Sequence, residues 1–336
     1  MIIDKNFERK ILQSLEAVSE QLSEFSGRLE RLEHATEEMR QNGSTTFTKL
    51  NVLSEKTEQR FSGVDIRLMC DSFYLYSLFS MCQNHLFLDK HISPPSAVYK
   101  YFRDFHDATA VHQVITPGVV KTRVGRDFDG GYVMVRPFSR NKIAYSFGIN
   151  DDVSWDKQMA SEGYAIYQYD HTISSLPEEN PAFHWKPFGL TGEDETEQLK
   201  RIETFLRENG HDNTEGMVLK MDIEGWERSV FQSVVPDTLN RFDQITVEVH
   251  NVLDPVLSPV LLDGLRNVAQ THICVHVHAN CFSQTHYCGD LALADTLELT
   301  YIKKNLYEVR KSEEVFPISI DMPNRGGSPD MWMGKW

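Results

Sequence analysis

The chain has 336 residues, of which 40% are hydrophobic and 11% aromatic, so it can bury a sizeable core and form two units rather than one. Its 34 basic and 49 acidic residues give a formal net charge of −15. This balance argues against nucleic acid or an anionic lipid surface as the main partner. The 5 cysteines are odd in number and include no CxxC pair, which indicates reduced thiols in a cytoplasmic protein. The sequence shows no secretory signal, and no apolar run reaches the roughly 18 residues of a transmembrane span.

The N-terminal residues 1–68 carry the strongest periodic pattern. Apolar side chains follow alternating steps of three and four positions, at Leu15, Val18, Leu22, Phe25, Leu29 and Leu32. This spacing predicts an α-helical coiled coil, which is interrupted at residues 43–46 and then resumes in a shifted phase. We therefore expect a homo-oligomer, whose number of strands the pattern leaves open.

Residues 69–110 predict a helical connector. Aromatic and aliphatic residues dominate from residue 64 to residue 88, where either peripheral membrane contact or a buried helix fits. We favour the buried helix. Pro94 and Pro95 end this segment, and residues 97–110 predict one more helix before the main domain at 111–336.

The main domain alternates strands and helices. A hairpin is the simpler interpretation of the paired glycines Gly130 and Gly131. The later pattern predicts strands at 142–147, 165–169, 217–221, 244–250 and 273–278, and helices at 154–162, 195–209, 226–234 and 257–270. Residues 297–301 and 330–333 read as late antiparallel strands. This order predicts a doubly wound, Rossmann-like α/β domain.

Polar residues and glycines stand where the predicted strands end. Gly148 follows the first strand, Asp170 follows the second, and Asp222 follows the strand at 217–221. Ligands of open α/β sheets lie at the carboxyl ends of the strands, and a carboxylate at the second strand suits ribose hydroxyls. Asn150 stands where a dinucleotide motif has its second glycine, so a pyrophosphate is a poor fit.

Four motifs together resemble the FkbM-like family of class I S-adenosylmethionine-dependent methyltransferases. They occur in order at residues 125–132, 145–152, 219–227 and 247–250. The resemblance covers about residue 123 to the C-terminus, and Trp226 departs from it because a small residue is commoner there. It implies a class I methyltransferase fold and hydroxyl groups of sugars or related products as acceptors. The cofactor would then contact Gly131, Tyr132, Phe147, Gly148, Asn150, Asp170, His171 and Asp222.

The resemblance also places the acceptor chemistry near residues 222–227, at His250, and at the histidine pair His276 and His278. A sugar hydroxyl is a poor nucleophile at neutral pH, so a base or a metal helps. His250 is the candidate base, Asp222 is the alternative, and Glu224 is a third candidate catalytic residue. A divalent ion held by Asp222, Glu248 and His250 would serve the same end.

Two further functions compete with an O-methyltransferase acting on a sugar or polysaccharide hydroxyl. The first is a coiled-coil scaffold that carries a catalytically weak, methyltransferase-like binding domain, which the asparagine at position 150 favours. The second is a nicotinamide-dependent oxidoreductase, which ranks last because it needs a glycine pattern that the sequence lacks.

Overall fold

The computed structural model describes residues 96–254, 257–288 and 291–336, which belong to one compact unit. The predicted coiled coil and the aromatic segment at residues 64–88 lie outside the described residues. Helix α3 (Ser96–Ala108) matches the helix predicted before the main domain. No helix in the described part of the chain combines the length and the apolar character that a membrane span requires.

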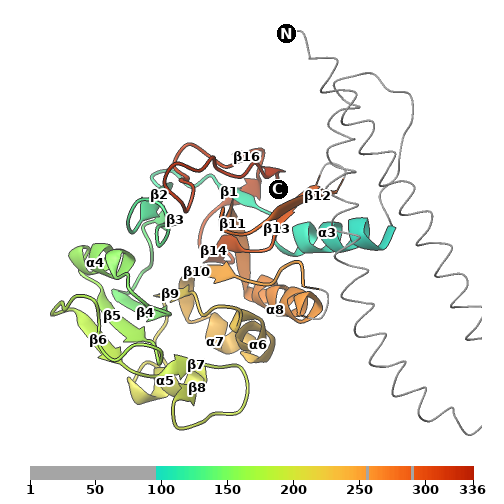
Figure 1. The fold of residues 1–336 in the computed structure, drawn as a ribbon. Coiled ribbons are helices and arrows are strands. Elements are labelled where there is room, and N and C mark those ends of the chain that lie inside the picture. Colours follow the sequence, from blue (N-terminus) through green and yellow to red (C-terminus); the bar gives the residue numbers. More distant parts are fainter. Residues whose placement is uncertain (1–95, 255–256, 289–290) are drawn as a thin grey trace, which may run out of the picture. The chain divides into compact units, whose positions relative to one another are not determined.

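A mixed seven-stranded sheet forms the centre of the fold (Figure 1). Its order is β11-β14-β10-β9-β4-β5-β6. The strands are β4 (Ile143–Phe147), β5 (Ala165–Tyr169), β6 (Phe183–Lys186), β9 (Met217–Met221), β10 (Phe242–Val249), β11 (His272–Ala279) and β14 (Leu297–Lys303). Neighbours from β10 through β6 pair in parallel, whereas β14 runs antiparallel to both β10 and β11. The α/β prediction and the late antiparallel strand at 297–301 are confirmed.

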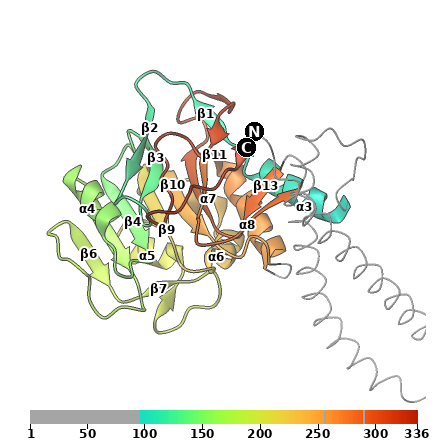
Figure 2. The ribbon, with the colours of Figure 1, turned by 45° about the horizontal axis from the view of Figure 1, so that its top comes forward.

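The helices pack on both faces of this sheet. Helix α4 (Ser154–Ser161) lies on one face together with the hairpin of β2 (Val120–Val124) and β3 (Tyr132–Arg136). The opposite face carries α5 (Ile202–Glu208), α6 (Glu227–Ser233), α7 (Pro236–Leu239) and α8 (Ser258–Thr271) (Figures 1 and 2). Helix α5 is shorter than predicted because β8 (Leu199–Lys200) pairs with β7 (Gly189–Leu190) just before it.

Short antiparallel pairs complete the unit. They are β1 (His112–Val114) with β15 (Val309–Lys311), β12 (Thr285–Cys288) with β13 (Leu291–Ala294), and β16 (Val315–Phe316) with β17 (Gly334–Lys335). The strand predicted at 330–333 is wrong, because the C-terminal pairing begins only at Gly334.

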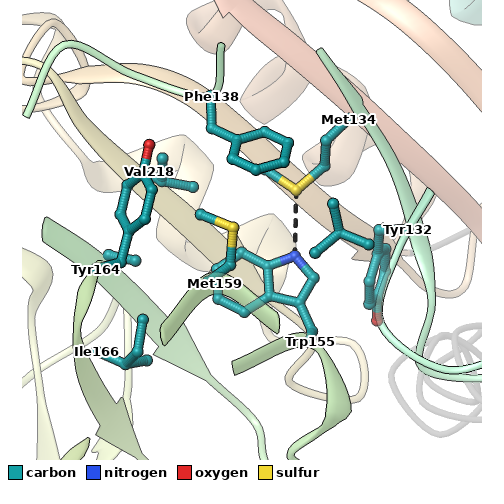
Figure 3. Packing of buried hydrophobic residues seen from close by; sticks show 10 residues of the cluster. Tyr132, Met134, Phe138, Trp155, Met159, Tyr164, Ile166 and Val218 are labelled. Carbon is teal, nitrogen blue, oxygen red and sulfur yellow. Dashed lines mark hydrogen bonds between the residues drawn. The ribbon is translucent and has the colours of Figure 1, made fainter. Parts of the chain in front are cut away.

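A buried cluster anchors the hairpin and α4 to the sheet (Figure 3). Trp155 of α4 is almost fully buried, and its indole N–H donates a hydrogen bond to Met134 Sδ of β3 at 3.1 Å. Ala144, Ile166 and Val218 supply the sheet side of the cluster. This packing fixes the hairpin over the sheet face that also carries the polar side chains described next.

That face carries two rows of polar positions near the carboxyl edge of the sheet. Cross-strand pairing aligns a deep polar row, which consists of Gln168, Ser146, Lys220, Thr246, Thr300 and His276. Side chains alternate between the two faces of a strand, so the residue two positions further toward the edge shares this face, which is two positions later in most strands and two positions earlier in the antiparallel β14. These residues form an edge polar row of Asp170, Asp222, Glu248, Glu298 and His278, with Gly148 at the position of β4. The register of the sheet therefore gathers residues that lie more than a hundred positions apart in sequence.

Candidate active site

A cavity of about 500 Å³ opens at the carboxyl ends of β4, β5 and β9. Of the residues predicted to contact a cofactor, six line it: Tyr132, Gly148, Asn150, Asp170, His171 and Asp222. Gly131 and Phe147 do not. The Phe147 ring packs on Tyr169 and Phe205, with ring centroids 5.2 Å apart in each pair. Gly131 shapes the hairpin turn, where a Cβ would overlap the Arg126 carbonyl oxygen.

Gly148 brings the ends of β4 and β9 into close contact. Its φ is +78°, a left-handed value that glycine adopts without strain. A Cβ at this position would overlap the carbonyl oxygen of Asp222. Asn150 also has a positive φ, of 48°, a left-handed conformation that asparagine adopts more readily than most other residues with a side chain.

The Asp170 carboxylate holds this turn in place, and each of its two oxygens accepts two hydrogen bonds. Oδ2 accepts the backbone N–H groups of Ile149 (2.8 Å) and Asn150 (2.9 Å). Oδ1 accepts the N–H (2.8 Å) and the hydroxyl (2.6 Å) of Thr172. Burial alone would raise the pKa of Asp170, but these hydrogen bonds outweigh it and the pKa is lowered. A carboxylate accepts about four hydrogen bonds, so a ribose hydroxyl must displace one of these donors, and the ribose role stays a prediction.

We expect Asp170→Asn to destabilise the turn as well as the ligand site. An asparagine offers one oxygen and an NH₂ group, so some of the four donors lose their acceptor. We expect a loss of about 2 kcal/mol in the free energy of unfolding, because hydrogen bonds to charged groups contribute about that much. Urea unfolding, compared with the exposed Asp127→Asn as control, measures the loss. Equal stability of the two variants would contradict this role.

Asp222 and Glu224 line the cavity, and His250 lies beside them without lining it. One potential ligand atom from each lies within 4.8 Å of the others. Tyr132 donates its hydroxyl hydrogen bond to Asp222 Oδ2 at 3.0 Å. The structure thus brings the three predicted catalytic residues together.

The loop after β9 is built around Glu227. Glu227 Oε1 accepts the N–H groups of Ile223 (2.8 Å) and Gly225 (3.3 Å). Glu224 has a positive φ of 57°, so the loop keeps a non-glycine residue in a sparsely populated conformation, as functional loops often do. The exposed Trp226 lines the cavity at the start of α6.

His250 is surrounded by carboxylates. Its Nδ1 lies 3.4 Å from Glu227 Oε1, and its Nε2 lies 3.6 Å from Glu224 Oε2 and 3.7 Å from Glu248 Oε1. Burial lowers the pKa of His250, but Glu227, Glu248 and Asp222 more than offset this and raise the pKa to about 9. At neutral pH the imidazole therefore carries a proton in the ligand-free protein.

Glu248 fits the predicted metal set less well than Glu224 does. Its Oε1 accepts a hydrogen bond from the Asn280 amide at 2.7 Å. Burial, with Asp222 and Glu298 nearby, raises the pKa of Glu248 well above its usual range. Glu224, rather than Glu248, supplies a potential ligand atom within 4.8 Å of those of Asp222 and His250, so the geometry replaces Glu248 by Glu224 in the candidate set.

The histidines of β11 are occupied by the C-terminal segment. His276 Nε2 lies 2.8 Å from Asp321 Oδ1. His278 contacts both Asp330 Oδ1 (2.9 Å) and Glu298 Oε2 (3.1 Å). Burial opposes the charge of His278, but these carboxylates raise its pKa to about 11. Both histidines therefore tie the C-terminal segment to the sheet.

Sequence reasoning missed several polar groups that line the cavity, among them Asp129, Asp156 and Lys220. The Asn324 amide donates to Asp129 Oδ1 (3.3 Å) and to Glu298 Oε1 (2.6 Å). Of the missed residues named here, Lys220 alone stands out in the sequence, because it is a lysine inside the apolar stretch 217–221.

Comparison with known proteins gives one match to a family model within the described domain. The family model described as the methyltransferase FkbM domain matches residues 120–261. No curated protein matches the chain. Among solved structures, the crystal structure of SMU.776, a proposed methyltransferase, complexed with SAH aligns with a TM-score of 0.31 and 9% sequence identity. The alignment covers 48% of this chain and 45% of that one, so the match spans less than half of either protein. Residues 120–261 of this chain therefore match a methyltransferase FkbM domain, and they lie in an α/β fold that has a mixed seven-stranded sheet.

Proposed function

We propose that this protein is a cytoplasmic, S-adenosylmethionine-dependent O-methyltransferase that acts on a sugar or polysaccharide hydroxyl. The observation that carries the proposal is one cavity in a region that matches the FkbM domain, lined by a left-handed glycine turn and by Asp222 and Glu224, beside which His250 lies. A volume of about 500 Å³ suits a nucleoside-sized ligand.

The charges of the cavity favour a cationic cofactor. Its lining includes seven carboxylates, at Asp129, Asp151, Asp152, Asp156, Asp170, Asp222 and Glu224. Only two basic side chains accompany them, at Arg126 and Lys220, with His171 as a further titratable group. S-adenosylmethionine would supply a sulfonium methyl group, whose positive charge such a lining stabilises. The turn at Gly148, with Asn150 and His171, would hold the cofactor.

Activation of the acceptor would fall to Asp222, Glu224 and His250. His250 can accept the hydroxyl proton only after it has lost its own, so a pKa of about 9 predicts a rate that rises with pH up to that value. Asp222 is the alternative base, and its Oδ2 is oriented by Tyr132. Glu224 is exposed and lies beside His250, so an acceptor whose hydroxyl group is at His250 would also contact Glu224.

A divalent metal ion is a second way to activate the hydroxyl, favoured by the convergence of Asp222, Glu224 and His250. Bound there, the ion would acidify the acceptor hydroxyl. The metal would have to displace the proton from His250, so its binding would strengthen with pH.

The experiment that tests the proposal is methyl transfer from trideuteromethyl S-adenosylmethionine. The full-length protein is incubated with the cofactor and a panel of neutral oligosaccharides, with and without Mg²⁺, and the products are analysed by mass spectrometry. The proposal expects one trideuteromethyl group on a sugar oxygen. Label on a nitrogen, or none in any glycan although the cofactor binds, would contradict the assignment of the acceptor.

The domain arrangement also stays a proposal. We infer that residues 1–68 form a coiled coil that makes the enzyme an oligomer, with residues 69–110 as connector and 111–336 as the catalytic domain. Several sites on one oligomer would raise the effective concentration at a polymeric substrate. Deletion of residues 1–63 is expected to give monomers by light scattering, and oligomers that persist would contradict the inference. A folded chain that binds no cofactor would instead support the scaffold alternative.

A further inference from the structure

The deep polar row places buried groups of opposite charge beneath the glycine turn. Lys220 of β9 and Asp156 of α4 are 6% and 1% exposed, and both line the cavity. Ser146 stands directly between Gln168 and Lys220 in the sheet register. Helix α4 brings Asp156 over this row, where Lys220 is a nearby charge and the side chains of Ser146 and Gln168 are close enough to hydrogen-bond the Asp156 carboxyl group.

These groups have unused hydrogen-bonding capacity. Asp156 Oδ1, Ser146 Oγ and both polar atoms of the Gln168 amide are buried, and none of them makes a hydrogen bond of good geometry, although Ser146 and Gln168 lie within reach of the Asp156 carboxyl group. Lys220 Nζ donates to the Gly148 carbonyl oxygen at 2.9 Å, which uses one of its three N–H groups. In the described structure no ion pair within 4.0 Å joins Lys220 to Asp156.

This arrangement destabilises the folded protein unless a further polar or charged group pairs with these side chains. A buried charge without an ion pair, or a buried polar atom without a well-formed hydrogen bond, destabilises the folded protein. Burial raises the pKa of Asp156, and the nearby Lys220 acts against that rise without an ion pair. Because both groups line the cavity, a ligand with one anionic and one cationic end can satisfy both.

We propose that Lys220 and Asp156 form a subsite for the α-amino acid group of the ligand. The ligand carboxylate would pair with the Lys220 ammonium, and the ligand ammonium would pair with Asp156, with Ser146 and Gln168 as further partners. The inference rests on the proposed function, since S-adenosylmethionine ends in such a group. The competing explanation is that ordered water fills the gap and Lys220 serves only to hold the Gly148 turn.

Calorimetric titration of the full-length protein separates the two explanations without a known acceptor. The three probes are S-adenosylhomocysteine, its decarboxylated form, which lacks only the carboxylate, and methylthioadenosine, which lacks the whole amino acid group. We expect the wild type to bind S-adenosylhomocysteine more than about 30-fold more tightly than methylthioadenosine, as two charge-assisted contacts would give.

The variants assign each charge. Lys220→Met is expected to weaken S-adenosylhomocysteine binding about 10- to 100-fold, with no effect on methylthioadenosine or on the decarboxylated ligand. Asp156→Asn is expected to weaken both amine-bearing ligands and to spare methylthioadenosine. Lys157→Met is the matched control, because Lys157 lies next to Asp156 in sequence, on α4, but points to solvent and pairs with Glu178 at 2.6 Å.

Three outcomes are decisive. Equal weakening of S-adenosylhomocysteine and methylthioadenosine by Lys220→Met would mean that Lys220 only supports the turn, and would overturn the subsite. Equal affinity of the wild type for all three probes would overturn it even if the variants fail to fold. If the folded wild type binds none of the probes, the proposed function itself fails, and the subsite fails with it.

Discussion

Gly148→Ala is expected to abolish detectable binding of S-adenosylhomocysteine and to lower the free energy of unfolding by more than about 3 kcal/mol. The new Cβ would overlap the Asp222 carbonyl oxygen, so the ends of β4 and β9 must separate. The residue would also be forced to keep a φ of +78°, which costs an L-amino acid about 1 kcal/mol. Urea unfolding and calorimetry measure the two effects.

Gly163→Ala is the matched control for this prediction. Gly163 has a similar φ of +86°, but a Cβ there would meet no atom within 4 Å. Its loss of stability should therefore be limited to the backbone term of about 1 kcal/mol, with ligand binding intact. If the two variants lose the same stability and both bind the ligand, the close approach of β4 and β9 does not define the site.

His250→Gln is expected to remove a pH-dependent part of the stability and, in the enzyme, most of the turnover. The pKa of His250 is raised from 6.5 to about 9, so the folded protein holds a proton that the unfolded chain releases. Its contribution is fully present below about pH 6.5 and is lost as the pH rises through about 9. The shift corresponds to at most about 3 kcal/mol. Urea unfolding at several pH values should show the wild type losing this advantage over the variant between those limits.

His211→Gln provides a control of opposite sign. Burial and the neighbouring His184 lower the pKa of His211, so its contribution to stability is present above pH 6.5 and is lost as the pH falls.

The second effect of His250→Gln concerns turnover. Removal of a general base lowers the rate about 10²- to 10⁴-fold, whereas the affinity for S-adenosylhomocysteine should stay unchanged. Turnover that survives in His250→Gln would assign the base to another group, with Asp222 as the first candidate.

The strand ends of this domain are predictable because they depend on local patterns. The run at 165–169 matches β5 residue for residue, and the apolar stretch 217–221 matches β9. Once these strands lie parallel, Gly148, Asp170 and Asp222 must share one edge of the sheet. The hairpin at Gly130 and Gly131 follows from equally local chemistry.

The partners of each polar group are a different matter, because they depend on long-range contacts. The sequence pattern places Glu248 beside His250, but the left-handed turn at Glu224 brings an exposed carboxylate equally close to the imidazole. His276 and His278 pair with Asp321 and Asp330, which no local period connects to β11. Likewise, the hydrogen bonds that the Asp170 carboxylate accepts depend on how the turn at Ile149 folds back toward it.

The central claim is that this cavity binds S-adenosylmethionine. Its most direct test is calorimetric titration of the full-length protein with S-adenosylmethionine and, separately, with NADH, each with and without Mg²⁺. The account predicts binding of S-adenosylmethionine at about micromolar concentration and none of NADH. A folded protein that binds NADH, or that binds neither compound, would contradict it.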